Sequence, residues 1–127
     1  MTTWSETIQD HVSNRRNIGP LDTATHQGVA GVPGDGPYMR LWLEIHEGRI
    51  VRAAYQTYGC VAAIASGSIT AALLTGLTVD RALLLTAPDI LLVLGGLPEG
   101  KEHCPQLAVA AMHNALDKER STQEREE

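Results

Sequence analysis

The chain has 127 residues, of which 43% are hydrophobic, and it carries a formal net charge of −5. This length suits a single domain spanning residues 1–127, and the apolar content is enough to build a core. The negative charge and the lack of a long basic run argue against nucleic acid as the main partner, because phosphate binding requires clustered Lys and Arg.

The apolar stretches are too short or too interrupted to predict a membrane segment. Residues 1–17 are polar throughout, which is not typical of a signal peptide. The longest apolar stretch, residues 82–94, is broken by Thr86, Pro88 and Asp89. We therefore expect a cytoplasmic protein without membrane contact, whose cysteines are kept reduced.

The first half of the chain predicts one helix followed by a hairpin. Residues 5–13 have apolar side chains one helical turn apart, which is typical of a short amphipathic helix. Residues 23–36 are rich in Gly and Pro and are expected to form a loop. Apolar and polar residues then alternate over residues 39–45, and an extended pattern resumes over 50–58. The intervening Glu47-Gly48 predicts a tight turn between two strands.

The second half predicts helices. Small and apolar residues over 60–76 favour a closely packed helix, and Thr78 and Thr86 are expected N-caps of two short ones. A last helix should run from near Pro105 to about Arg120, followed by a frayed tail over residues 121–127. The predicted fold class is α+β, with a small antiparallel sheet of about three strands packed against several helices and covered on one side.

The only two cysteines both stand where a helix is predicted to begin. Cys60 follows the strand-like run that ends at Tyr58-Gly59, and His103-Cys104 opens the last helix. The partial positive charge of a helix N-terminus stabilises a thiolate, and a neutral imidazole is a natural co-ligand beside it. The pattern therefore points to metal or sulfur chemistry.

Each of these residues also has an ordinary interpretation. Cys60 alone is more often a small buried hydrophobe than a ligand, and Lys101 alone is most often solvated. Asp35, in the Gly/Pro-rich loop, is typical of a turn former, and His103 could be an exposed imidazole at a helix start. The remaining histidines are expected to lie on the surface or on helix faces, as His11 on the first helix would.

Taken together, several segments resemble the IscU/NifU-type iron–sulfur cluster assembly scaffolds over nearly the whole chain. The matching segments, in order, are Trp4 to Gly19, Gly31-Val32-Pro33-Gly34 with Met39-Arg40-Leu41, the stretch from Tyr55 to Ser66 around Cys60, and Leu97 to Cys104. The 43 residues between Cys60 and Cys104 are similar to the spacing of the short IscU-type branch.

The resemblance implies a site and a function. Scaffolds of this family gather three cysteines, a histidine and an aspartate at one end of the molecule. They receive sulfur from a cysteine desulfurase and build a [2Fe-2S] cluster from Fe²⁺ and sulfur for recipient apo-proteins. By this resemblance Cys60 matches the second cysteine, His103 the histidine, Cys104 the third cysteine, and Lys101 the lysine two residues before the histidine.

The first cysteine of the family pattern is missing from this chain. An ungapped alignment places Asp35 there, whereas a gapped alignment keeps Gly34-Asp35 as the family Gly-Asp pair and deletes the cysteine. Either way, Asp35, Cys60, His103 and Cys104 form the expected ligand set. Such a set can hold Zn²⁺ or Fe²⁺ in tetrahedral geometry, and it suits a cluster less well because clusters prefer thiolates.

The segment before His103 resembles the peptide by which the family binds an Hsp70-type chaperone. Leu97, Pro98 and Lys101 match its Leu-Pro and Lys, while its middle differs. Two other functions stay open: a thiol-dependent enzyme with Cys60 as nucleophile and His103 as base, and a metal-free adaptor that binds the desulfurase. We expect binding and transfer of cargo rather than enzymatic turnover.

Overall fold

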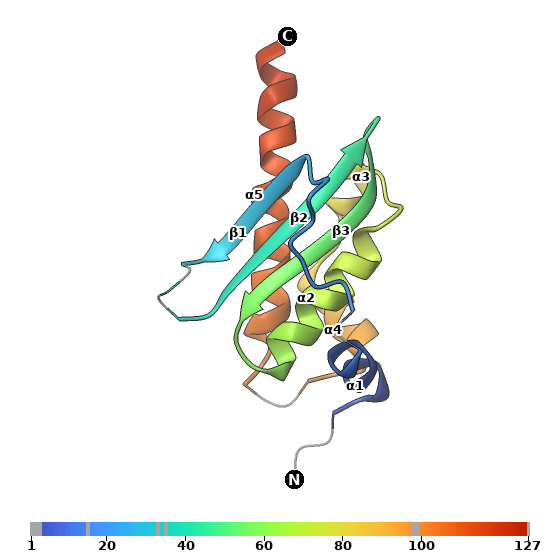
Figure 1. The fold of residues 1–127 in the computed structure, drawn as a ribbon, viewed down its shortest axis with the longest axis vertical. Helices are drawn as coiled ribbons and strands as arrows, with labels where there is room; N and C mark the ends of the chain where they lie inside the picture. Colours follow the sequence, from blue (N-terminus) through green and yellow to red (C-terminus); the bar gives the residue numbers. More distant parts are fainter. Residues whose placement is uncertain (1–3, 15, 33, 35, 98–99, 127) are drawn as a thin grey trace.

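A three-stranded antiparallel sheet in the order β1-β2-β3 is packed on one face by helices (Figure 1), which confirms the α+β class. The computed structural model describes residues 4–14, 16–32, 34, 36–97 and 100–126, with side chains up to residue 117. The elements are α1 (Glu6–Ser13), β1 (His26–Gly31), β2 (Tyr38–His46), β3 (Arg49–Tyr58), α2 (Val61–Leu74), α3 (Val79–Ala82), α4 (Ala87–Leu94) and α5 (His103–Glu126).

The predicted hairpin is present as β2 and β3. Met39, Leu41 and Leu43 are fully buried against the helices, and they alternate along β2 with the partly exposed Arg40, Trp42 and Glu44. The turn that joins the strands uses Glu47 (φ 53°) and Gly48 (φ 77°). Two successive positive φ angles match the right-handed twist of the flanking strands, which explains why this dipeptide can close the hairpin.

One prediction for this region is wrong: residues 26–31 form a strand, not a loop. β1 pairs with β2 in register from His26↔Leu43 to Gly31↔Tyr38. At Gly28 the strand backbone lies against α5 so closely that an added Cβ would come within 2.3 Å of the Ala111 carbonyl oxygen. The glycine that resembles loop punctuation in the sequence is therefore the contact between sheet and helix.

Helix α2 is the centre of the core, and its small residues let the sheet come close. A Cβ added at Gly67 would come within 2.5 Å of the ring of Tyr55 and 2.9 Å of the Met39 sulfur. The buried polar side chains of the described residues are Ser66, Ser68 and Thr70, all on this helix. Figure 1 shows α2 behind β3, with α5 behind β1 and β2.

The short helices begin at the residues that the sequence predicts. Thr78 caps α3, and Thr86 forms a capping box with Asp89 at the start of α4. Gly95 ends α4 in the left-handed conformation at φ 81°. The Ser5 side chain caps α1 and also donates to the Leu94 carbonyl, so the start of α1 is bound to the end of α4.

The predicted end of the last helix near Arg120 is also wrong. Helix α5 continues to Glu126 and extends past the sheet to the C-terminal end of the drawn ribbon (Figure 1). Residues 118–126 contain no Gly or Pro, so nothing in their sequence ends the helix.

Groups from outside the sheet bind both of its outer strands: backbone segments on β3 and one side chain on β1. Residues 17–19 pair with Tyr55 of β3, through Gly19 N–H to the Tyr55 carbonyl (2.7 Å) and Tyr55 N–H to the Asn17 carbonyl (3.0 Å). Farther along β3, Ile50 exchanges backbone hydrogen bonds with residues 76 and 77. On β1, the Val29 N–H donates to Asn114 Oδ1 of α5 at 3.0 Å.

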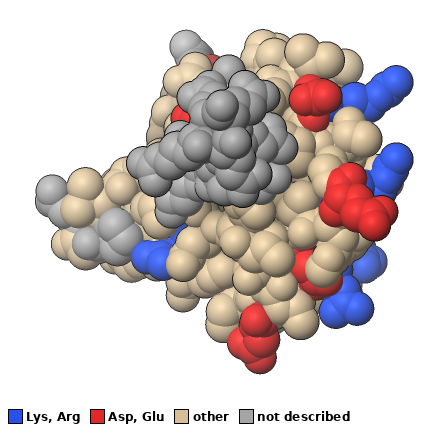
Figure 2. All heavy atoms as spheres, turned by 90° about the horizontal axis from the view of Figure 1, so that it is seen from above, with Lys and Arg blue, Asp and Glu red and all other residues tan. Residues whose placement is uncertain are grey.

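Charged side chains of both signs lie beside each other on the face drawn in Figure 2. Among the charged side chains, Glu44 pairs with His46 at 2.8 Å and with Arg52 at 3.9 Å. Among the helices of the described residues, none is long and apolar enough to cross a membrane.

Candidate metal and sulfur site

The candidate site lies where α2 and α5 begin. Cys60 follows the end of β3 and is the N-cap of α2, with extended backbone angles (φ −87°, ψ −178°). Gly59 makes the turn between strand and helix, where an added Cβ would come within 3.0 Å of the Ala63 side chain. The thiol-bearing residue is exposed. Cys60 therefore lies at a helix N-terminus, as the sequence predicts, and the structure adds that it is open to solvent.

Cys104 is the second residue of α5 and is only 2% exposed. Its N–H bonds to the Lys101 carbonyl at 3.1 Å, which closes the turn that leads into the helix. Its side chain packs with Ala62 and Ala63, in the first turn of α2, and Trp4 and Leu97 cover this small cluster. The start of α5 is thus packed directly onto the start of α2.

The surroundings of the two thiols shift their pKa values in opposite directions. Partial burial raises the pKa of the Cys60 thiol, but the N–H groups of Ala63 and Ala62, the charge of Lys101 and the Cys104 thiol outweigh it, so that the pKa is lowered. Burial raises the pKa of Cys104 to about 11; the neighbouring Cys60 adds to this rise and Lys101 opposes it. The exposed Cys60 thiol therefore ionises more easily than an ordinary cysteine, while the buried Cys104 thiol keeps its proton.

His103 is exposed, and its Nε2 atom lies 3.6 Å from the Cys104 sulfur. No hydrogen bond joins His103 to Cys60 within the described part of the chain, so the imidazole is not positioned as a base for that thiol. Lys101 is half-buried between the ends of the two helices and supplies positive charge to both sulfurs. The described residues thus bring Cys60, Lys101, His103 and Cys104 to one end of the fold.

Two of the predicted residues, Asp35 and Pro98, lie outside the described residues. The flanking Gly34 and Gly36 have positive φ angles of 88° and 89°, and with Tyr38 and Tyr58 they line a cavity of about 460 Å³. Tyr58, which lines this cavity, is two residues before Cys60 in the sequence. Within the described ranges, no group of three or more Cys, His, Asp and Glu side chains forms a metal-holding cluster.

Leu97, predicted to contact a partner, is half-buried and packs on the cluster around Cys104. A partner that binds this segment would therefore reach only part of the leucine side chain. Lys101 remains accessible, because it too is only half-buried.

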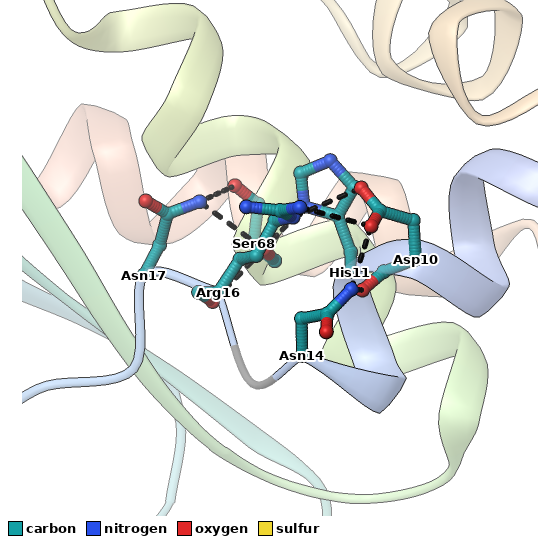
Figure 3. Close-up of polar contacts among 6 residues, drawn as sticks. All are labelled: Asp10, His11, Asn14, Arg16, Asn17 and Ser68. Atoms are coloured by element: carbon teal, nitrogen blue, oxygen red, sulfur yellow. Dashed lines mark hydrogen bonds and ion pairs between the residues drawn. The ribbon is translucent and has the colours of Figure 1, made fainter.

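A polar network that the sequence does not predict attaches the N-terminal segment to α2 (Figure 3). Its centre is the buried Ser68: the hydroxyl donates to the Arg16 carbonyl (3.0 Å), accepts from Asn17 Nδ2 (3.2 Å) and contacts His11 Nδ1 (2.6 Å). At its exposed end, Arg16 and Asn14 both bind the Asp10 carboxylate. His11 is half-buried on the face of α1 that meets α2, and the available sequence signal was the group of Ser and Thr residues within the largely apolar α2.

Removing the Ser68 hydroxyl should destabilise the fold. Ser68→Ala leaves the Arg16 carbonyl, the Asn17 amide and the His11 imidazole short of a partner, so we expect a loss of about 2 kcal/mol in the free energy of unfolding. Ser66→Ala is the matched control, because Ser66 is equally buried on α2 but bonds only to the Ala62 carbonyl one turn earlier. Urea unfolding should show a change within about 0.5 kcal/mol for this control. Equal losses in the two variants would contradict a tertiary role for Ser68.

The network also predicts a pH dependence of stability. Burial lowers the pKa of His11 from its ordinary 6.5; Asp10 opposes this shift and Arg16 adds to it. The unfolded chain therefore binds this proton more readily than the folded chain, so stability is fully present above pH 6.5 and falls as the pH drops through 6.5 toward the folded pKa. Urea midpoints at about pH 7.5 and about pH 5.5 should differ more in the wild type than in His11→Gln. A His11→Gln variant with the full pH dependence would exclude His11 as its source.

Sequence and structure comparisons identify similar proteins over almost the whole chain. The family described as NifU-like N terminal domain matches residues 3–126. The iron–sulfur cluster assembly scaffold protein IscU of Escherichia coli is 36% identical over 125 residues, which cover 95% of this chain and 97% of that protein. IscU 1 of Archaeoglobus fulgidus is 36% identical over 113 residues, covering 89% of this chain and 74% of that protein.

Two solved structures share the fold at low sequence identity. The SufU-type chain from Fervidobacterium islandicum has a TM-score of 0.69 at 18% identity, with 89% of this chain and 96% of that chain covered. The N-terminal NifU-like chain from Brucella abortus has a TM-score of 0.61 at 20% identity, with 95% and 94% covered.

Proposed function

Because the chain belongs to the family of NifU-like N-terminal domains, we propose that it acts as a scaffold-like protein of iron–sulfur cluster assembly. It would bind iron, zinc or a labile [2Fe-2S] cluster and pass this cargo on. The observation that carries the proposal is the packing of Cys104, at the start of α5, on Ala62 and Ala63, directly after the N-cap Cys60 of α2, with His103 beside Cys104. Sequence-related proteins are named as iron–sulfur cluster assembly scaffolds, which supports the same role.

The proposed ligands are the sulfurs of Cys60 and Cys104, the His103 imidazole and the Asp35 carboxylate. Thiolate, imidazole and carboxylate ligands together suit Zn²⁺ or Fe²⁺ in a tetrahedral shell. Cys60 is prepared for this role by the N–H groups of Ala62 and Ala63, which stabilise its thiolate. Cys104 must release its proton when the metal arrives, because only the thiolate is a ligand. Binding of cargo should therefore be linked to proton release.

The proposed partners follow from the same family membership. A cysteine desulfurase would deliver sulfur to the exposed Cys60, and recipient apo-proteins would take the finished cargo. An Hsp70-type chaperone would bind the segment of Leu97, Pro98 and Lys101. We assign no catalytic residue, since the chain binds and transfers its cargo rather than turning it over.

Anaerobic reconstitution tests this function. The reduced protein is incubated with ferrous iron and sulfide, desalted without air, and analysed for bound metal and acid-labile sulfide. We expect iron with labile sulfide, and a visible absorption that decays under a chelator. Asp35→Cys should lengthen the lifetime of this absorption, because a third thiolate donates more strongly to iron than a carboxylate does.

The reconstitution experiment tests the scaffold role and the assignment of Asp35 separately. Neither metal nor sulfide on the wild type would reject the scaffold role and favour a metal-free adaptor. Equal decay of the wild type and Asp35→Cys would reject only the assignment of Asp35 to the position of the missing cysteine.

A further inference from the structure

The two cysteines of the site differ sharply in access. Cys60 is exposed at the N-terminus of α2, whereas Cys104 is 2% exposed beneath Trp4 and Leu97. A sulfur donor from outside the molecule can therefore reach Cys60 but not Cys104. The other thiol of the chain, Cys104, packs on Ala62 and Ala63, which are two and three residues beyond Cys60, so it lies close to a modified Cys60.

We propose that Cys60 accepts a sulfane sulfur as a persulfide and that the buried Cys104 thiol then displaces it as sulfide, leaving a Cys60–Cys104 disulfide. This inference rests on the proposed function only in assuming that a persulfide donor delivers sulfur to Cys60. It gives the chain a second activity, the reductive release of sulfide, that needs no external electron donor for one round.

Atoms and electrons balance in both steps. First, the Cys60 thiolate attacks the outer sulfur of a donor persulfide, so that the donor leaves as a thiolate and a Cys60 S–S bond forms. Second, the Cys104 sulfur attacks the inner sulfur, that of Cys60, and the outer sulfur leaves with the bonding electron pair. The two cysteine sulfurs are oxidised to the disulfide, the sulfane sulfur is reduced to sulfide, and the thiol proton of Cys104 leaves with it as hydrogen sulfide.

The order of events follows from packing rather than from acidity. Cys104 is fixed by the turn that closes through Lys101 and by its contacts with Ala62 and Ala63, so it stays beside Cys60 throughout. An intramolecular thiol held in this way acts at a high effective concentration. These two are the only cysteines of the chain, so a disulfide between them removes both proposed thiolate ligands at once. Release of sulfide and binding of metal by both thiolates therefore exclude each other.

The test uses the reduced full chain under argon with glutathione persulfide as the donor. Intact mass and peptide mapping follow the protein, and released sulfide is measured separately. We expect the wild type to gain one sulfur on Cys60 and then to lose it, ending as the Cys60–Cys104 disulfide with sulfide in solution. In Cys104→Ala the persulfide on Cys60 should last at least roughly tenfold longer, because the neighbouring thiol is missing. Cys60→Ala should stay unmodified.

Two controls keep the outcomes distinct. Wild type without donor should stay reduced, and circular dichroism should show that Cys104→Ala, which replaces a buried side chain, is folded. Wild type in which the Cys60 persulfide lasts as long as in Cys104→Ala overturns the inference, as does a persulfide that ends on Cys104 without a disulfide.

Zinc binding, measured on reduced protein without donor, and persulfidation, measured on reduced protein without zinc, together separate this inference from the scaffold role. If zinc binds the reduced protein but no disulfide follows persulfidation, the scaffold role stands and the inference fails. If the disulfide and sulfide form while the reduced protein binds neither zinc nor iron, the inference stands and the scaffold role fails. If the scaffold role and this inference are both right, bound zinc should block persulfidation of Cys60.

Discussion

Zinc should raise the melting temperature of the wild type and leave that of Cys104→Ser unchanged. A metal that binds only the folded site stabilises it by about 4 kcal/mol at a concentration 1,000 times the dissociation constant. Cys104 is buried between the first turns of α2 and α5, so a metal held there bridges the two helices. The serine variant lacks one of the two thiolates and should lose this gain. The measurement is a thermal melt with and without zinc for each protein.

The zinc-dependent shift is the quantity to compare, because Cys104→Ser also loses stability without metal. Gln106→Ala is a suitable control: Gln106 is exposed, lies two residues beyond Cys104 on α5 and belongs to no predicted ligand set. This variant should keep the full zinc response. An undiminished response in Cys104→Ser would place the zinc elsewhere on the molecule.

Gly28→Ala should lower the free energy of unfolding by about 3 kcal/mol or more, at the severe end of overpacking. The new methyl group would come within 2.3 Å of two backbone atoms of α5, the Ala111 carbonyl oxygen and the Ala115 nitrogen. Backbone atoms inside a helix cannot turn aside as a side chain can, so the whole helix must move away from β1. Urea unfolding measures the loss.

Gly48→Ala is the matched comparison for Gly28→Ala. Gly48 has open space around its missing Cβ but a φ of 77°, so its substitution tests backbone strain without a clash. This variant should lose only about 1 kcal/mol. A Gly28→Ala variant as stable as Gly48→Ala would mean that α5 and β1 are packed less closely than the structure shows.

The sequence predicts well those elements whose local residue pattern is compatible with only one secondary structure. The alternation over residues 39–45 admits only a half-buried strand, and Thr86 with Asp89 three residues later admits only a helix start. β1 lacked such a pattern. Its pairing with β2 and its contact with α5 at Gly28 decide its conformation, and both partners are distant in the sequence.

The sequence predicts which residues form the candidate site, but it does not predict how exposed each of them is. The helix starts and the family resemblance identify Cys60, His103 and Cys104, but nothing in the sequence indicates that one cysteine is exposed and the other buried. That difference arises from the packing of the start of α5 onto Ala62 and Ala63. The Ser68 network was missed for a similar reason, since His11 and Ser68 are 57 residues apart.

The contacts along the outer strands limit how another protein can bind to the edges of the sheet. A sheet edge with free N–H and C=O groups accepts a further strand from a peptide or a second chain. Here residues 17–19 and 76–77 occupy positions along β3, and Asn114 bonds to the Val29 N–H of β1. A strand-adding partner would first have to displace these contacts. The fold therefore opposes strand addition and edge-to-edge aggregation along β3, and at Val29 of β1.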